Sequence, residues 1–280
     1  MLGQDLVPYI AGRHEVIPVD MAEADIADAG QISRVISYAK PNVVIHAAAF
    51  TAVDDCERNP DLSFQVNAEG TRNVALACRQ SRAAMVYIST DYVFDGKKTS
   101  PYIETDDPNP INVYGRSKLQ GEKYIAELIE HSWIVRTSWL FGPLGKNFVE
   151  AILARARQGE SLRVVDDQVG GPTYTMDLAG KLAEIVERGK SGIYHVTGQG
   201  YCSWFEFSQE ILAQAGMGNT AISPIDTAAS GRPAPRPRNS RLANTCLVEQ
   251  GLGLLPSWQN ALGRYLVRET NLQVQSCAVP

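Results

Sequence analysis

The sequence predicts an α/β fold, in which a parallel sheet is covered by helices on both of its faces. Two observations lead to this prediction. Short runs that are apolar on both faces and rich in β-branched residues recur along the chain, as they do in buried parallel strands. Amphipathic stretches of helix length separate these runs, and such an alternation of strand and helix is typical of parallel sheets.

The apolar runs are the predicted strands, and the amphipathic stretches are the predicted helices. The strands are His14–Val19, Asn42–Ala49, Ala84–Ser89, Trp133–Thr137, Leu162–Val165 and Gly192–Val196. The helices are Gln31–Ala39, Leu62–Arg82, Tyr114–Ile129, Phe148–Gln158, Met176–Arg188 and Trp204–Ala215.

The start of the chain is unusual for the dinucleotide-binding (Rossmann) version of this fold. That version begins with a strand and a glycine-rich turn ahead of the first helix. Here Met1 leads at once into a helix-like stretch, followed by the strand that ends at Asp20. We therefore expect the first strand-helix unit to be cut just inside its glycine turn. An acidic residue at the position of Asp20 accepts hydrogen bonds from a ribose 2′-OH, which favours NAD(H), with NADP(H) left open.

The regular alternation fades after about residue 145, where Gly/Pro-rich turns, short helices and the basic, proline-rich stretch Gly231–Arg241 take over. We expect a Rossmann-type nucleotide-binding domain in residues 1–145 and a smaller, mainly substrate-binding region in residues 146–280. An interleaved boundary between the two is left open.

Composition and charge argue against several classes of protein. The chain is 44% hydrophobic and 20% charged, which is typical of a globular domain. A net charge of −5 disfavours a nucleic-acid partner. The cysteines show no C-x-x-C spacing, which disfavours a disulfide framework or a structural zinc site. Without a membrane-length apolar run or a signal-peptide pattern, we expect a soluble, cytoplasmic protein.

Tyr114 and Lys118 form a candidate catalytic pair. A spacing of four residues at the start of a predicted helix places both side chains on one face, one turn apart. A free tyrosine has a pKa of about 10 and is a poor acid or base at neutral pH. A lysine cation nearby stabilises the tyrosinate and lowers that pKa. Taken alone, the spacing also fits two solvated helix residues.

Thr90 adds context to this pair. It belongs to the end of a predicted buried strand, and ligands bind at the carboxyl ends of strands in open α/β sheets. Its hydroxyl can hydrogen-bond a substrate carbonyl and the Tyr114 phenol together, although a turn or helix-capping role is the alternative. A strand-end threonine, a tyrosine and a lysine are what short-chain dehydrogenases use to move a proton while nicotinamide moves a hydride.

Separate motifs along nearly the whole chain extend the pattern. They are STDYVFDG (89–96), NVYGRSKLQGE (112–122), RTSWLFG (136–142), DDQVGGPT (166–173) and RPRNSRL (236–242). Together they resemble the dTDP-4-dehydrorhamnose reductase family of the extended short-chain dehydrogenase/reductase superfamily. The resemblance implies NAD(P)H-dependent reduction of the C4 ketone of dTDP-4-dehydro-L-rhamnose to dTDP-L-rhamnose, a precursor of bacterial surface polysaccharide.

The resemblance also implies roles at the catalytic end of the site. Tyr114 falls on the general acid, and Lys118 falls on its partner. Thr90 falls on the group that tunes the tyrosine and holds the sugar carbonyl. Asp91 falls on a neighbouring substrate contact. Trp139 falls on a substrate-contacting tryptophan, with a buried core tryptophan as the alternative.

The basic stretch is the candidate site for the nucleotide. Arginine forks match phosphate oxygens well, so a group of arginines suits the pyrophosphate of a dTDP-sugar. Arg236 is our candidate among them, and a solvated charged loop is the alternative. The arginines are Arg232, Arg236, Arg238 and Arg241.

On the cofactor side, the resemblance adds Tyr114, Lys118 and three pairs of residues. Met1 and Leu2 match the end of the glycine turn. Asp25 and Ile26 match residues that lie along the adenine, and Ala49 and Thr51 match contacts to the pyrophosphate and ribose. Asn67 matches a helix start, where a structural hydrogen-bonding role is expected.

Two other readings stay open. A nucleotide-sugar epimerase or dehydratase of the superfamily also carries the tyrosine and lysine, but dehydratases place an acidic pair after the threonine, and here Asp91 is followed by Tyr92. The second alternative is that the protein is a non-catalytic regulator, like the regulatory subunit of methionine adenosyltransferase. The resemblance allows Mg²⁺ and a homodimer, although the sequence shows no carboxylate cluster that demands a metal.

Overall fold

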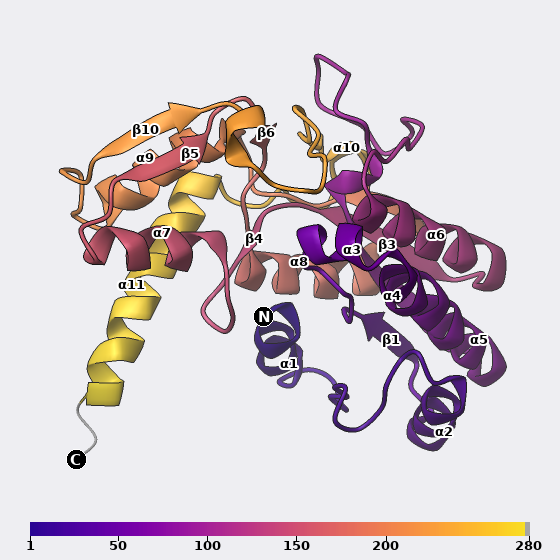
Figure 1. The fold of residues 1–280 in the computed structure, drawn as a ribbon. Coiled ribbons are helices and arrows are strands. Elements are labelled where there is room, and N and C mark those ends of the chain that lie inside the picture. Colours follow the sequence, from indigo (N-terminus) through magenta and orange to yellow (C-terminus); the bar gives the residue numbers. More distant parts are fainter. Residues whose placement is uncertain (278–280) are drawn as a thin grey trace.

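The computed structural model describes residues 1–277, with side chains to Arg268. Its main sheet is parallel, with the strand order β1-β2-β3-β8 (Figure 1). Helices cover both faces, which confirms the predicted α/β class with a Rossmann-type sheet. The strands of this sheet are β1 (Val43–His46), β2 (Ala84–Thr90), β3 (Ser132–Thr137) and β8 (Gly192–His195).

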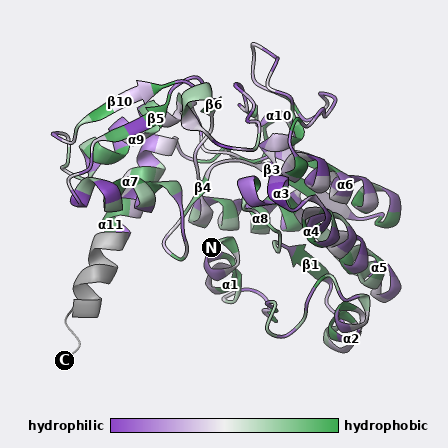
Figure 2. Ribbon diagram, viewed as in Figure 1, coloured by the Kyte–Doolittle hydropathy of each residue, from purple (hydrophilic) through white to green (hydrophobic). Residues whose placement is uncertain are grey.

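The two faces of the sheet bury different side chains of the same strand. Met85 and Tyr87 of β2 belong to a core with α2 (Ala29–Ala39), α5 (Thr71–Ser81) and α6 (Val113–Leu128). The alternating residues Val86 and Ile88 belong to the opposite core. In Figure 2 α5 and α6 carry both hydrophobic and hydrophilic stretches, as expected of helices that bury one face. The helices of the opposite core are α1 (Leu2–Ile10), α8 (Thr175–Arg188) and α10 (Thr245–Glu249).

A region beside the main sheet has a core of its own, which we call the smaller core because it serves only this region (Figure 1). It contains the parallel pair β5 (Leu162–Val165) and β10 (Ile222–Ile225), with α7 (Phe148–Arg157), α9 (Trp204–Gln214) and α11 (Trp258–Cys277) around it. Because β8 and α8 follow residue 145 but lie with the main sheet, the chain crosses between the two cores. No helix within the described residues is long and apolar enough to cross a membrane.

Short elements join these parts. Two small pairings are β4 with β7 and β6 with β9. Their bounds are β4 (Leu140–Phe141), β6 (Val169–Gly170), β7 (Thr173–Tyr174) and β9 (Cys202–Ser203). The short helices are α3 (Val53–Arg58), α4 (Pro60–Phe64), the π-helix η1 (Gln65–Gly70) and the 3₁₀ turns η2 (Asp91–Val93) and η3 (Ala228–Ser230).

Two predicted elements differ from the structure. The predicted strand His14–Val19 is wrong: these residues form no strand, and Ile17 and Val19 are 55% and 44% exposed. A strand needs a hydrogen-bonded neighbour, and within the described residues the segment pairs with none. Asp20 therefore closes no strand. The predicted single helix Leu62–Arg82 is instead divided into α4, η1 and α5.

Candidate active site

The carboxyl edge of the main sheet brings predicted site residues together. Thr90 is the last residue of β2 and pairs in register with Thr137 at the end of β3. Asp91 follows at the start of η2, and both Thr90 and Asp91 are buried. Because the strands are parallel, the segments that follow β1 and β3 leave the sheet at the same edge.

Thr90 and Asp91 are hydrogen-bonded to each other. The Thr90 hydroxyl donates to Asp91 Oδ1 at 3.0 Å and accepts from the Tyr92 N–H at 3.2 Å. Asp91 Oδ2 is buried and has no hydrogen-bond partner among the described residues. Burial raises the pKa of Asp91 to about 7, although hydrogen bonds to the carboxylate oppose this shift. Asp91 therefore changes charge close to neutral pH.

Tyr114 reaches this pair from the first turn of α6. The Asn112 side chain caps that helix by accepting from the Gly115 N–H at 2.7 Å. A Cβ atom on Gly115 would stand 2.0 Å from the Tyr92 carbonyl oxygen, so glycine is needed for α6 to approach η2 this closely. The rings of Tyr92 and Tyr114 meet edge to face, with centroids 6.1 Å apart.

The Tyr114 phenol is held in its protonated form. Burial raises its pKa above the usual range, and the Asp91 carboxylate raises it further, while a hydrogen bond with Thr90 acts in the opposite direction. The sequence argument expected the Lys118 cation to lower this pKa. The direction is the reverse: burial is the largest cause and the Asp91 charge adds to it, whereas Lys118 is not among the causes of the shift.

Lys118 lies one helical turn after Tyr114 and is buried, whereas Tyr114 is half-buried. Its Nζ stands 4.1 Å from the centre of the Tyr87 ring, a cation–π contact. Burial lowers the pKa of Lys118 to about 7, and the negative charge of Glu122 acts against this shift. The lysine therefore also changes charge near neutral pH.

A buried ion pair fastens α6 to the sheet beneath these residues. Glu122 accepts from Arg136 Nε at 3.0 Å and from Arg136 Nη2 at 2.7 Å. The Ser89 hydroxyl donates to the same carboxylate at 2.5 Å. Because Ser89 and Arg136 belong to β2 and β3, this network fixes the helix that carries Tyr114 and Lys118.

Trp139 follows β3 with a left-handed backbone, φ 47°. Its ring stacks on Trp204, with centroids 3.4 Å apart and planes inclined by 7°. A Cβ atom on Gly170 would come within 2.5 Å of the Trp139 ring, so the indole also packs closely against β6. Trp204 covers one face of the indole, and the predicted contact of Trp139 with a sugar stays a prediction.

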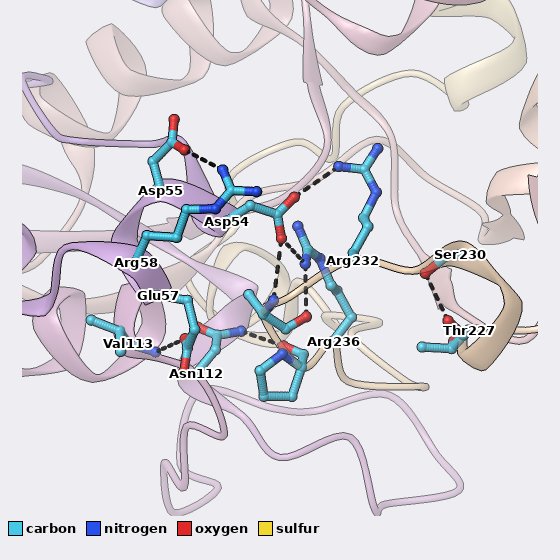
Figure 3. A network of polar contacts seen from close by, with 12 residues as sticks. Asp54, Asp55, Glu57, Arg58, Asn112, Val113, Thr227, Ser230, Arg232 and Arg236 are labelled. Carbon is cyan, nitrogen blue, oxygen red and sulfur yellow. Dashed lines mark hydrogen bonds and ion pairs between the residues drawn. The ribbon is translucent and has the colours of Figure 1, made fainter.

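Arg236 lies in the basic stretch, close to the first turn of α6 (Figure 3). Its side chain is 9% exposed and forms an ion pair with Asp54 of α3 at 2.5 Å. Burial and the Asp91 charge raise the pKa of the nearby Tyr92 phenol, and the Arg236 charge acts against them. Tyr92 therefore links Arg236 to Tyr114, and the structure brings Arg236 together with the predicted catalytic residues.

The segment after β1 carries two predicted cofactor contacts. Ala49 is half-buried and Thr51 is exposed. Between them, the Phe50 N–H donates to Asn67 Oδ1 at 2.7 Å, and Asn67 Nδ2 donates to the Phe50 carbonyl at 3.0 Å. Asn67 Nδ2 also donates to Ser117 Oγ at 3.0 Å, which gives Asn67 the structural role expected for it.

The other predicted cofactor residues lie apart from the Tyr114 cluster. Asp25 accepts from the Ala27 N–H at 2.9 Å. Ile26 packs against Gly70, where an added Cβ atom would stand 2.9 Å from the isoleucine side chain. Asp20 is exposed, and it makes local hydrogen bonds with Met21, Glu23 and Ala24.

At the start of the chain, Leu2 is buried in the core beside α8. Met1 precedes α1, and its carbonyl accepts from the Gln4 N–H at 3.1 Å. The proposed cofactor roles of both residues, and of Asp20, Asp25, Ile26, Ala49 and Thr51, stay predictions. No group of three or more His, Cys, Asp or Glu residues among the described residues is placed to hold a metal ion.

Sequence reasoning missed Asn112, Glu122 and Asp54. Asn112 has a readable signal, because asparagine directly before a predicted helix is a typical N-cap. Glu122 lies one turn beyond Lys118, but nothing in the sequence around it predicts its partner Arg136 on β3. Asp54 has no signal of its own, since its partners Arg232 and Arg236 come from the far end of the chain.

Comparison with known proteins identifies the family. The sequence model of the family described as "RmlD substrate binding domain" matches residues 1–271. The chain belongs to this family. A relative from Aggregatibacter actinomycetemcomitans named dTDP-4-dehydrorhamnose reductase is 41% identical, over 93% of each chain. A relative from Streptomyces niveus named dTDP-4-keto-6-deoxy-D-glucose reductase is 34% identical, over 94% of this chain and 92% of that one.

A solved structure agrees with these RmlD-family relatives. It is a dTDP-4-dehydrorhamnose reductase from Bacillus anthracis in complex with NADP. It superposes with a TM-score of 0.93 at 39% identity, over 95% of each chain. The family resemblance that the motifs predicted is confirmed.

Proposed function

We propose that this chain reduces the C4 ketone of dTDP-4-dehydro-L-rhamnose to dTDP-L-rhamnose with NAD(P)H. The observation that carries the proposal is the placement of Tyr114, in the first turn of α6 against Tyr92, next to Thr90 and Asp91 at the carboxyl edge of the sheet, with Lys118 one turn away. Membership of the RmlD family supports the same reaction, because relatives that match over almost the whole chain are named as reductases of dTDP-4-keto sugars.

In this mechanism Tyr114 donates its proton to the C4 oxygen as the ketone becomes an alcohol. Its raised pKa keeps the phenol protonated until the developing alkoxide, a far stronger base, takes the proton. Thr90 would hold the same oxygen by turning its single O–H from Asp91 Oδ1 to the sugar. Lys118 balances the negative charge that Tyr114 carries after the transfer.

The residues around the cluster fit a nicotinamide cofactor. The backbone after β1 carries only small side chains, Ala47 to Ala49, so a flat ring or a pyrophosphate can approach it closely. Lys118, one turn after Tyr114 on α6, would hold the ribose of the cofactor through its ammonium group. When bound, the cofactor supplies the hydride. Both NAD(H) and NADP(H) fit this proposal, since Asp20 is exposed in a local turn.

The test of the proposal is Tyr114→Phe, which removes the proton donor and keeps the ring. Turnover of dTDP-4-dehydrorhamnose should fall by about 10²-fold or more, the usual scale of general acid catalysis. Oxidation of NADPH by the purified protein is the measurement. Tyr124→Phe is the matched control, because Tyr124 lies on the same helix but hydrogen-bonds Glu69 at the surface. Near-normal turnover of Tyr114→Phe would remove Tyr114 from the mechanism.

The same assay separates the alternatives. An epimerase would convert the sugar without net oxidation of NADPH, a dehydratase would release water from a different sugar, and a regulator would leave NADPH untouched. We further propose that the enzyme works in the cytoplasm, has no nucleic-acid partner and forms a homodimer. Cell fractionation and light scattering test location and assembly.

A further inference from the structure

A short basic segment connects the smaller region to the active-site helices. We call residues Arg232–Arg236 the arginine strap. Figure 3 shows the strap against α3, with Asp54 placed between Arg232 and Arg236. These two arginines lie 178 and 182 residues farther along the chain than the carboxylate that receives them.

The carboxylate of Asp54 accepts three hydrogen bonds from the strap. Arg232 Nη1 donates to Asp54 Oδ2 at 3.0 Å. Arg236 Nη1 donates to Asp54 Oδ1 at 2.5 Å, and the Ala234 N–H donates to the same oxygen at 3.2 Å. Partial burial raises the pKa of Asp54, but these donors outweigh it and bring the pKa to about 2. Asp54 is therefore charged throughout the physiological range.

The two arginines differ in exposure. The Arg236 side chain is 9% exposed, whereas the Arg232 side chain is 61% exposed. Each guanidinium uses its Nη1 on Asp54, and a guanidinium carries five N–H donors in a fixed plane. Two arginines face the single carboxylate of Asp54, and Glu57 of α3 adds a second negative charge to the same hydrogen-bonded unit. The N–H donors that the arginines do not use on Asp54, rather than a net charge, favour an anionic ligand.

The strap also touches the catalytic helix. Asn112, which caps α6 ahead of Tyr114, donates from Nδ2 to the Pro235 carbonyl at 2.9 Å. Glu57, three residues after Asp54 on α3, accepts from the Val113 N–H at 3.0 Å. The strap, α3 and the first turn of α6 are therefore one hydrogen-bonded unit (Figure 3).

We propose that Asp54 is a positioning residue for the substrate: it fixes the planes of Arg232 and Arg236 so that their remaining N–H groups receive the diphosphate of the nucleotide sugar. The proposal rests on the proposed function, because the nucleotide sugar supplies the diphosphate. Asp54 itself touches no substrate. Its part is to hold two flexible side chains in one geometry, which removes the loss of side-chain entropy that diphosphate binding would otherwise carry.

The test is binding of dTDP, measured by calorimetry on the intact protein without turnover. Asp54→Asn should weaken dTDP binding by about tenfold or more, because an amide holds two guanidinium groups poorly. Binding of thymidine, which has no phosphate, should change by less than about twofold. In steady-state assays KM for the nucleotide sugar should rise by a similar factor, with kcat and KM for NADPH nearly unchanged.

Asp55→Asn is the matched control. Asp55 is the next residue on α3, and it pairs with Arg58 in an ion pair whose two side chains are both at least half exposed. This variant should bind dTDP like the parent. Arg232→Ala tests the inference even if Asp54→Asn fails to fold, because Arg232 is exposed and its loss should not disturb the fold. This variant should weaken dTDP binding without changing the midpoint of thermal unfolding.

The outcomes separate this inference from the proposed function. If the protein reduces the sugar but Asp54→Asn binds dTDP as tightly as the parent, or more tightly, then Asp54 does not position the arginines. Equal weakening of dTDP and thymidine would give Asp54 a merely structural role and also overturn the inference. If no sugar is reduced while dTDP binding still depends on Asp54, the proposed function fails and the diphosphate site stands.

Discussion

The Asp91 carboxyl group lies where its charged form lowers the free energy of unfolding. One of its oxygens accepts from Thr90, and the other is buried without a hydrogen-bond partner in the part of the chain that the structure describes. Burial raises its pKa from an ordinary value of 3.8 to about 7. The folded protein therefore holds a proton here that the unfolded chain releases, between about pH 4 and pH 7.

The sign of this linkage gives a prediction at the residue scale. Because the folded state binds the extra proton, Asp91 lowers stability progressively as the pH rises through that window, and stability stays lowered above pH 7. Asp91→Asn removes the charge, so the variant should be more stable than the parent by about 2–4 kcal/mol near pH 8. Near pH 4 the two proteins should be almost equally stable.

Urea unfolding at both pH values measures this difference. Lys118 acts in the opposite direction, because burial lowers its pKa and its proton is lost on folding at higher pH. It is present in both proteins, so it cancels in the comparison. A stability difference that does not change with pH would show that Asp91 stays ionised in the folded protein. Turnover should fall in the variant, since Asp91 is a predicted substrate contact.

At the residue scale, the sequence predicted which residues meet and not how their charges behave. Spacing placed Tyr114 and Lys118 one turn apart, and the strand-end rule placed Thr90 beside them. The direction of the Tyr114 pKa depends on burial and on Asp91, which spacing does not reveal. The left-handed backbone of Trp139 was also beyond prediction, since its stacking partner Trp204 belongs to α9, far along the chain.

At the scale of elements, α6 is held from below by a charged contact. Glu122 and Arg136 are both buried, and Arg136 donates to both carboxylate oxygens. Such a pair contributes little net stability compared with well-packed apolar residues, but loss of one partner leaves the other charge buried. The pair therefore makes the position of α6 sensitive to single substitutions.

Glu122→Gln should accordingly be costly although it hardly changes shape. It leaves Arg136 charged and uncompensated, and we expect a loss of about 3–5 kcal/mol in the free energy of unfolding. Denaturant unfolding is the measurement. The double variant Glu122→Gln with Arg136→Met should recover a large part of the loss, because the unpaired charge is gone. A single variant as stable as the parent would contradict the assignment of a buried ion pair.

Elements were predictable where a segment carries its own pattern. The strand Leu162–Val165 and the helices around Tyr114 and Phe148 have the predicted place within one or two residues. The segment His14–Val19 has strand-like residues but no neighbour to pair with in the described structure. Its residue pattern therefore predicted a strand that does not form. The π-helix within the predicted helix Leu62–Arg82 contains Asn67, whose partners Phe50 and Ser117 are distant in sequence.

At the scale of the whole molecule, a buried polar junction joins the two cores. Asp5 of α1 is fully buried and accepts from the hydroxyl of Thr175, the first residue of α8, at 2.5 Å. Arg268 of α11 lies 3.6 Å from the same carboxylate. Asp177, two residues after Thr175 in α8, pairs at 2.6 Å with Arg264, which lies one turn before Arg268 in α11. Since α8 packs on the main sheet and α11 on the smaller core, the junction couples their stability.

This coupling predicts one cooperative unfolding transition for both cores. Thr175→Val keeps the side-chain shape but removes the hydroxyl, so the buried Asp5 carboxylate loses a donor and stability should fall by about 1–3 kcal/mol. Calorimetry should show a single peak, moved to lower temperature as a whole. Thr175→Ser keeps the hydroxyl and should stay close to the parent. Two peaks, of which only one moves, would mean that the cores unfold independently and that the Asp5 junction does not join them.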